Sequence, residues 1–434
     1  MIEWGSEEAK ENRAVLVAAG EDRQLGELAR LAETLGLEVV GELEQGRRDG
    51  SGYIGRGKRV ELHGLVEEAG AGVVVADDEL TASQARVLEE AAGAAVIDRT
   101  ALIIRIFAEH ARDAASRLEV ELAELSYRLP RIKGGATALS RLGGGGAGGG
   151  GARRGSGEQQ LEYDRRTIRE RMASIRGKLS GERSARGVRG ARLKRGGTPT
   201  VALVGYTNAG KTTILNALSG AGRSTRDRLF ETLETTTRLV SGTNTGASDG
   251  APNGRSEAHP DFVVTDTVGF IRKLPTQLVH SFAATLEAAR GAEVLVICAD
   301  AGEDLSSLSE ELDSVVGTLD EAGIAVEDAV LCLNKADLLP DEELRALKKE
   351  YPNAVVISAK SSVEPLVRAI HEKVSAGHER AEILIPHEHY GEAARLYGHA
   401  EIHARKDTVE GLWMDVTLPK EALQRYGRYR VTAS

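Results

Sequence analysis

The run TVALVGYTNAGKTT at Thr200–Thr213 constrains the fold more than any other part of the chain. It matches the pattern GxxxxGK[ST], with the apolar segment Val201–Val204 before it and an apolar helical pattern from Ile214 after it. The pattern requires a strand, a loop and a helix, because backbone N–H groups of the loop and of the helix N-terminus must face a phosphate chain. We therefore predict an α/β domain with a phosphate-binding loop here.

The side chains of this loop predict a nucleotide bound together with Mg²⁺. Lys211 can reach the outer phosphates, and the hydroxyl of Thr212 can bind the metal ion. A chance glycine-rich turn is the alternative, but the flanking strand and helix patterns argue against it. The predicted nucleotide-binding residues of the loop are Gly205, Tyr206, Thr207, Asn208, Ala209, Gly210, Lys211, Thr212 and Thr213.

The tetrad NKAD, which ends at Asp337, predicts that the base is guanine. It follows the apolar pattern AVLCL, so it is expected at the carboxyl edge of a sheet, where open α/β sheets bind ligands. The Asp337 carboxylate can accept from N1–H and N2–H₂ of guanine, whereas adenine offers no such donor pair. A turn with an Asx cap is the alternative. Asn334 would brace the loop, Lys335 would cover the base, and the SAK segment would complete the pocket with Ser358, Ala359 and Lys360.

Two further segments supply the predicted switch and metal residues. DTVG follows the strand pattern DFVVT, so Asp266 would hold the metal through water and the Gly269 N–H would contact the γ-phosphate. In LFETLETTTRLV one threonine should reach Mg²⁺, and we choose Thr236, with Thr235 and Thr237 as rivals. Ordinary strand threonines are the alternative. The predicted metal residues are Thr212, Thr236 and Asp266, and the predicted catalytic residues are Lys211, Thr236 and Gly269.

Position 270, directly after Gly269, is Phe. Many GTPases place a glutamine here to orient the attacking water, and a phenyl ring cannot do this. We therefore expect GTP hydrolysis to GDP and phosphate to be slow in the chain alone, with a partner or another residue supplying the missing function.

Basic residues are concentrated in one part of this acidic chain. The whole sequence has a net charge of −10, yet Arg128–Arg195 contains 18 Lys and Arg against 5 Asp and Glu. The resulting net charge of +13 predicts a polyanion partner for this segment. A solvated helix face is the alternative.

Apolar residues recur at helical spacing on both sides of a glycine-rich run. One pattern covers about Ala101–Leu129 and is ended by Pro130, and the other covers about Gln159–Leu179. We expect these helices to form an antiparallel hairpin. The run between them, RLGGGGAGGGGARRGSGE, is either a flexible linker or a basic tip that orders on a phosphate backbone.

These patterns predict an α/β chain in four parts. The first part contains the parallel-strand patterns RAVLVAA, LEVVGEL, AGVVVADDE and AAVIDR. The last contains the strand patterns ILIP and LWMDVTLP with a short helix between them. The four parts are an N-terminal α/β subdomain (1–112), the basic hairpin with its glycine-rich loop (113–196), the GTPase domain (197–376) and a small α+β C-terminal domain (377–434).

The remaining signals are weaker. No apolar stretch reaches the about eighteen residues of a membrane span, and the N-terminus lacks the progression of a secretory signal, so we expect a cytoplasmic monomer. Cys298 and Cys332 are expected to be buried thiols in a reduced compartment. A metal site at His387, His389 and Tyr390 has little support, and Gly52–Lys58 is expected to be a surface loop with a weak chance of binding RNA or a second nucleotide.

The chain resembles the HflX GTPases from about Gly52 to its end. The segments that carry the resemblance are GYTNAGKTT, LFETLETTTR, DTVGFIRKLP and NKAD, together with SGYIGRGKRVEL, DDELTASQARVLEE, VIDRTALIIRIFAEHAR and GSGEQQLEYDRR. The resemblance implies an N-terminal α/β subdomain, a helical hairpin, a GTPase domain with GTP or GDP and Mg²⁺, and binding to the large ribosomal subunit and its RNA. Some members of the family split stalled or idle ribosomes.

The chain departs from the family at two places. The family loop resembles GxGxRGPGE, whereas here Ser156 stands where Pro is expected, although Arg153 and Arg154 keep the charge. A polar insertion, Ser241–Pro260, precedes DTVG. A nucleotide-stabilised RNA-binding protein without significant turnover is the alternative function. A GTPase of tRNA modification is less favoured, because the chain lacks a Cys-bearing C-terminal tail.

Overall fold

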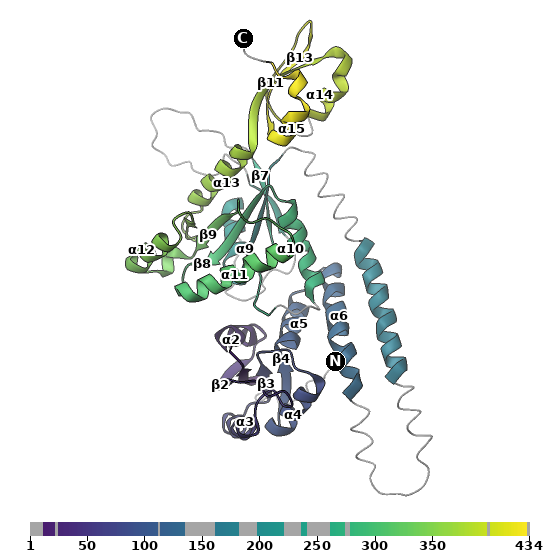
Figure 1. The fold of residues 1–434 in the computed structure, drawn as a ribbon, viewed down its shortest axis with the longest axis vertical. Helices are drawn as coiled ribbons and strands as arrows, with labels where there is room; N and C mark the ends of the chain where they lie inside the picture. Colours follow the sequence, from purple (N-terminus) through teal and green to yellow (C-terminus); the bar gives the residue numbers. More distant parts are fainter. Residues whose placement is uncertain are drawn as a thin grey trace. The chain divides into compact units, whose positions relative to one another are not determined.

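The computed structural model describes residues 12–21, 25–111, 113–134, 161–181, 198–220, 236–240, 261–273, 278–396 and 400–431. The chain forms two compact units. The first contains Met1–Gly181 with Asp227–Leu233 and Lys273–Phe282, and the second contains the remainder. Figure 1 shows the course of the chain. No helix among the described residues is long and apolar enough to span a membrane.

The first unit contains a four-stranded sheet in the order β2-β1-β3-β4, with every neighbouring pair parallel. The four strand patterns predicted for this part are confirmed, because each apolar run fills one strand of a sheet covered by helices. The strands are β1 (Arg13–Ala19), β2 (Glu38–Gln45), β3 (Val73–Ala76) and β4 (Ala95–Asp98), and the helices between them are α2 (Leu25–Thr34), α3 (Arg56–Ala69) and α4 (Ala82–Ala92).

The single helix predicted over about 101–129 was wrong, because two helices occupy this stretch. Helix α5 (Arg99–His110) ends where Ala111 adopts an extended conformation, and α6 (Ala114–Arg128) begins after Asp113. The Asp113 carboxylate accepts from the Ser116 N–H at 2.5 Å, so it caps the new helix. Continuous apolar spacing across residues 101–129 concealed this local cap.

The α-helix ends just before Pro130, as predicted, although a short 3₁₀-helix follows it. Helix α6 ends at Arg128, and Pro130 lies within the 3₁₀-helix Leu129–Gly134 that follows. A proline near the start of a short helical turn loses no hydrogen bond, since its N–H would have no partner there. The chain therefore continues in a tighter turn past the proline.

Helix α6 packs lengthwise against helical residues 161–181, and Figure 1 shows the two side by side. Glu121 accepts two hydrogen bonds from the Arg171 guanidinium, at 2.6 and 2.7 Å, beside the apolar seam. The glycine-rich run and its arginines lie outside the described residues. The seam is formed by Ala115, Leu122, Met172, Ile175 and Leu179, with Leu118, Leu125, Leu129 and Ile168 at its edge.

The second unit contains a six-stranded sheet in the order β10-β9-β8-β5-β7-β6, in which only the edge strand β6 is antiparallel. This arrangement places β5 between β8 and β7, so the loop after β5 is flanked by both neighbours. The strands are β5 (Thr200–Gly205), β6 (Thr236–Val240), β7 (Phe262–Asp266), β8 (Val294–Asp300), β9 (Val330–Asn334) and β10 (Val355–Val356), and the helices are α9 (Lys211–Ser219), α10 (Val279–Gly291), α11 (Leu305–Glu321), α12 (Asp341–Glu350) and α13 (Glu364–Gly377).

The cysteines lie in the core of this sheet. Cys298 and Cys332 are buried and free, and they face each other in register on β8 and β9. The hydrogen bond between the two thiols and their burial raise the pKa of Cys332 well above its ordinary value. The prediction of two buried thiols is confirmed.

A three-stranded antiparallel sheet, in the order β11-β13-β12, forms the end of the chain. The two predicted strands and the short helix are present, whereas β12 was missed because charged side chains dominate its sequence, EIHARKD. The elements are β11 (His378–Pro386), α14 (Tyr390–Leu396), β12 (Glu401–Asp407), β13 (Gly411–Pro419) and α15 (Lys420–Arg425).

The prediction that Gly52–Lys58 is a surface loop was wrong for its centre. The Tyr53 side chain is buried, its hydroxyl donates to Asp78 at 2.9 Å, and it accepts from the Ala19 N–H at 3.1 Å. Helix α3 already begins at Arg56. The buried phenol of this segment therefore packs at the carboxyl end of β1.

A buried ion-pair cluster stabilises the first unit. The Arg99 side chain is 3% exposed and lies 2.7 Å from Glu27 and 2.8 Å from Asp77, both also buried. Because these charges are removed from water, their pairing must offset the cost of desolvation, and Asp77 has a second cationic partner in Lys273 at 2.9 Å, whereas Arg99 pairs with both carboxylates.

Replacing Arg99 with Met should destabilise the first unit by about 3 kcal/mol, since it removes the cation that both buried carboxylates face. Amide hydrogen exchange in urea, followed on peptides from β1 and β3, measures the local unfolding free energy. The matched control is Arg86→Met, which removes an exposed i,i+4 pair with Glu90 and should change this free energy by roughly 0.5 kcal/mol or less. Equal effects of both variants would contradict the role of the cluster.

Candidate nucleotide-binding site

The predicted phosphate loop connects β5 to α9. It contains three residues in left-handed conformations: Gly205 (φ 146°), Asn208 (φ 64°) and Gly210 (φ 81°). A Cβ atom on Gly205 would lie 2.0 Å from the carbonyl oxygen of Cys298 on β8. Glycine is therefore required where the loop leaves the strand, both for its conformation and for the close approach of β8.

Lys211 lies at the start of α9 with its ammonium inside the loop. It is 6% exposed, and Nζ donates to the carbonyls of Gly205 at 3.1 Å and Tyr206 at 2.6 Å. Burial lowers the pKa of Lys211, while the nearby Asp266 carboxylate opposes this shift. A phosphate group would supply the negative charge that a buried ammonium favours, so this geometry fits the predicted contact with outer phosphates.

The predicted metal residues Thr212 and Asp266 lie together. The Thr212 hydroxyl donates to Asp266 Oδ2 at 2.7 Å, and the Asp266 side chain is fully buried at the end of β7. Hydroxyl and carboxylate oxygens are the ligands that Mg²⁺ prefers, and each would contact the ion directly or through water. The residues present therefore fit a magnesium ion.

The structure describes two of the three threonine candidates. Thr236 begins β6 directly opposite Asp266 in the register of the sheet, whereas Thr235 lies outside the described residues. The Thr237 hydroxyl lies 3.1 Å from the hydroxyl of Thr265, so it already has a partner within the sheet. Thr236 remains the predicted metal threonine.

Asn334 ties the guanine motif to the phosphate loop. Its Nδ2 donates to the Ala209 carbonyl at 3.1 Å, and its Oδ1 accepts from the Ala359 N–H at 2.9 Å. A Cβ atom on Gly210 would lie 2.2 Å from Asn334 Nδ2. One buried amide thus fixes the loop after β5 against the SAK segment after β10.

Lys335 and Asp337 follow on the same edge of the sheet. Lys335 adopts a left-handed conformation, and its Nζ lies 2.7 Å from Asp300 at the end of β8. Asp337 is largely exposed in the 3₁₀-helix Ala336–Leu338, and a hydrogen bond from the Ser358 side chain is the main cause that lowers the pKa of its carboxyl. Asp337 is therefore an ionised acceptor at neutral pH, as guanine recognition requires.

Asp300 is a site residue that the sequence reasoning missed. It is the last residue of an apolar strand, and its Oδ1 also accepts from the Gly302 N–H at 2.9 Å. A polar residue that ends a buried parallel strand lies at the edge where ligands bind, and this signal could have identified it. Its carboxylate fixes the ammonium of Lys335.

The DTVG segment reaches the phosphate loop through its last residue. A Cβ atom on Gly269 would lie 2.8 Å from Thr207 Cα and 2.9 Å from Lys211 Nζ, so only glycine fits. Phe270, which is 1% exposed, forms a parallel bridge with Tyr206. The structure thus brings the phosphate loop, DTVG, NKAD and SAK to one edge of the six-stranded sheet.

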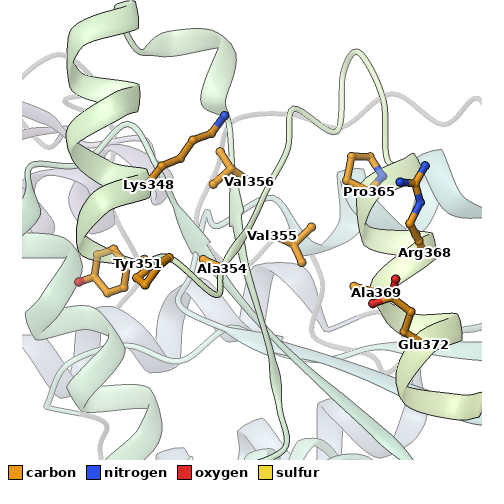
Figure 2. A pocket seen from close by; sticks show the side chains of 10 residues that line it. Lys348, Tyr351, Ala354, Val355, Val356, Pro365, Arg368, Ala369 and Glu372 are labelled. Atoms are coloured by element: carbon orange, nitrogen blue, oxygen red, sulfur yellow. The ribbon is translucent and has the colours of Figure 1, made fainter. Parts of the chain in front are cut away.

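Two other places on this unit are separate from that edge. A cavity of about 450 Å³ lies beside the edge strand β10, between α12 and α13, and Figure 2 shows its lining by Lys348, Tyr351 and Arg368. None of its lining residues belongs to the predicted nucleotide site. Among the described residues no group of three or more His, Cys, Asp or Glu side chains could hold a metal ion, so the weak signal at His387 and His389 gains no support.

Asp337→Asn should weaken GTP binding by about a hundredfold or more and create binding of xanthosine triphosphate, because an amide inverts the donor and acceptor pattern at position 337. Fluorescence titration with labelled forms of both nucleotides measures the two affinities. The matched control is Asp341→Asn on α12, which should change neither. Unchanged GTP affinity in Asp337→Asn would remove this residue from base recognition.

Three family models match the chain. They describe a GTP-binding GTPase N-terminal region at residues 22–108, a GTP-binding GTPase middle region at 110–192 and a 50S ribosome-binding GTPase at 200–335. The first covers the N-terminal region from α2 to most of α5, and the second covers the segment that contains the hairpin. The third covers the phosphate loop, DTVG and the first two residues of NKAD.

Curated relatives match over most of the length of the chain. GTPase HflX of Caldanaerobacter subterraneus subsp. tengcongensis is 40% identical, and the match covers 87% of this chain and 84% of that protein. GTPase HflX of Alkalihalophilus pseudofirmus is 37% identical, covering 87% and 90%. A solved structure of SsGBP with GDP is 21% identical and covers 84% of this chain and 98% of that one, with a TM-score of 0.44. These sequence relatives show that the chain belongs to the HflX family of GTPases.

Proposed function

We propose that this GTPase is a magnesium-dependent switch that docks on the large ribosomal subunit in its GTP form and leaves after hydrolysis. The observation that carries the proposal is the presence, in one chain, of the nucleotide site and of a segment with a net charge of +13. The family model described as a 50S ribosome-binding GTPase, which matches residues 200–335, supports the same partner. Such a role would be performed in the cytoplasm.

The residues of the site have separate tasks in this proposal. Lys211 and the backbone N–H groups at the start of α9 bind the phosphates, and Asn334 keeps the loop in place for them. Thr212 and Asp266 would hold Mg²⁺, which neutralises charge on the phosphates when it is bound. Gly269 donates its N–H toward the γ-phosphate, so the segment around it responds to the loss of that group.

Slow turnover in the absence of a partner is part of the proposal. Phe270 is buried and has no group that could orient water, so the chain itself lacks the usual water-positioning side chain at this position. The ribosomal subunit would complete the site or order Thr236 and its neighbours. Hydrolysis would then be fast only on the correct partner.

The helical hairpin supplies the docking surface. Among the described residues, Arg166 and Arg169 of helix 161–181 are more than half exposed, although each lies near a glutamate of the same helix. Their guanidinium groups would contact RNA phosphates, whereas the pair of Arg171 with Glu121 holds the helices together. Separation of the two ribosomal subunits would follow if the hairpin entered their interface, and we include this splitting in the proposal.

Added large subunits should raise the rate of GTP turnover by tenfold or more, and a non-hydrolysable GTP analogue should increase binding to the subunits relative to GDP. Sedimentation with purified subunits and phosphate release measure the two effects. A nucleotide-stabilised RNA-binding protein would bind the subunits equally with both nucleotides and show no stimulation. That result would contradict the switch.

Arg166→Glu with Arg169→Glu should lower the turnover stimulated by subunits by at least tenfold while the turnover of the chain alone stays unchanged. Binding of the unaltered chain should weaken steeply between 50 and 200 mM salt, on the order of a hundredfold for several phosphate contacts. The matched control is Arg86→Glu, an exposed charge reversal on α4. Equal losses in the control and the hairpin variant would show a general charge effect.

A further inference from the structure

Phosphate binding does not explain the role of the Tyr206 side chain. It occupies a free position of the GxxxxGK pattern, where the backbone alone serves the phosphates. Here the residue is large and only 4% exposed. Its hydroxyl accepts a hydrogen bond from the backbone N–H of Arg272 at 2.8 Å. The phenol therefore connects the phosphate loop with the segment that follows DTVG.

The backbone reinforces this connection at the other end of the same segment. The Phe270 N–H donates to the Gly205 carbonyl at 2.9 Å, and the Thr207 N–H donates to the Phe270 carbonyl at 2.8 Å. These two bonds flank Tyr206 and form its parallel bridge with Phe270. Together with the phenol, three hydrogen bonds hold residues 270–272 on the loop.

These bonds determine where Gly269 lies. It directly precedes Phe270, and it is packed so closely against Thr207 and Lys211 that no Cβ atom would fit. The Lys211 ammonium marks the place of the outer phosphates, so the Gly269 N–H belongs to the part of the chain nearest the γ-phosphate. A shift of residues 270–272 would move Gly269 with them.

The Arg272 side chain has a different partner. Its Nη1 lies 2.6 Å from Glu310 Oε2 on α11, whereas its backbone N–H serves Tyr206. Substitutions of the Arg272 side chain therefore leave the bond to the phenol possible, and the two anchors can be tested separately.

We propose that Tyr206 is a positioning residue for GTP hydrolysis. Its hydroxyl holds the Arg272 N–H and thereby keeps the Gly269 N–H directed to the γ-phosphate, in a site where Phe270 offers no polar group of its own. GDP has no γ-phosphate, so its binding does not depend on this hydrogen bond. Tyr206 thus makes the chain favour GTP over GDP as well as supporting turnover.

Tyr206→Phe removes one hydroxyl and keeps the buried ring. Removal of a hydrogen-bond acceptor from a partly buried N–H should weaken binding of a non-hydrolysable GTP analogue about five- to tenfold and lower turnover by a similar factor. The affinity for GDP should stay within about twofold of the unaltered chain. Isothermal titration with both nucleotides and single-turnover hydrolysis on the full chain measure these changes, and the melting temperature with GDP monitors folding.

Two control variants separate the proposal from a general effect. Tyr351→Phe, at the end of α12, removes a hydroxyl from the same unit outside the nucleotide site and should change neither affinity. Arg272→Ala keeps the backbone donor and should retain most of the preference for GTP. A parallel loss of GDP and GTP affinity in Tyr206→Phe, or no change in either, would overturn the proposal.

Amide hydrogen exchange on the unaltered chain tests the same bond without a substitution. The peptide that contains residues 268–273 should exchange at least as slowly with the GTP analogue as with GDP, because the phenol holds it in both states and the γ-phosphate adds a contact. Faster exchange with the GTP analogue would mean that GTP opens the segment, and Tyr206 would then not position it for hydrolysis.

Discussion

The buried ammonium of Lys211 is the interaction on which the nucleotide-binding unit depends. A cation with so little access to water is costly unless negative or polar groups surround it. Two consecutive loop carbonyls at the end of β5 and the field of Asp266 at the end of β7 serve this purpose. The pairing of β5 with β7 in the sheet brings these groups around one nitrogen.

The nucleotide site also requires that the loops after different strands keep fixed positions relative to one another. The Asn334 side chain fixes the phosphate loop against SAK, and Asp300 fixes the ammonium of Lys335. Both are short polar side chains at the ends of buried strands, and both act on neighbours rather than on solvent. The predicted guanine pocket is therefore preorganised by bonds within the protein, which lowers the entropic cost of binding a nucleotide.

Local patterns made much of this site predictable. The phosphate loop and NKAD each follow an apolar strand, and that spacing is visible without any tertiary information. The bonds of Asn334 to Ala209 and of Tyr206 to Arg272 join residues 125 and 66 positions apart, so they depend on which strands are neighbours. The break before α6 was different, because the capping side chain of Asp113 was a local signal hidden by continuous apolar spacing.

Phe270 shows how stability and catalysis compete at one position. A phenyl ring that is removed from water contributes on the order of 2 kcal/mol to packing, which a mobile glutamine at the same place would not supply. The backbone of Phe270 holds the DTVG segment on the phosphate loop, while its buried ring offers no group for water activation. Under the proposed function, such a site binds GTP and depends on a partner for fast hydrolysis. In the function proposed above, this combination would let the partner, and not the free enzyme, set the lifetime of the GTP-bound state.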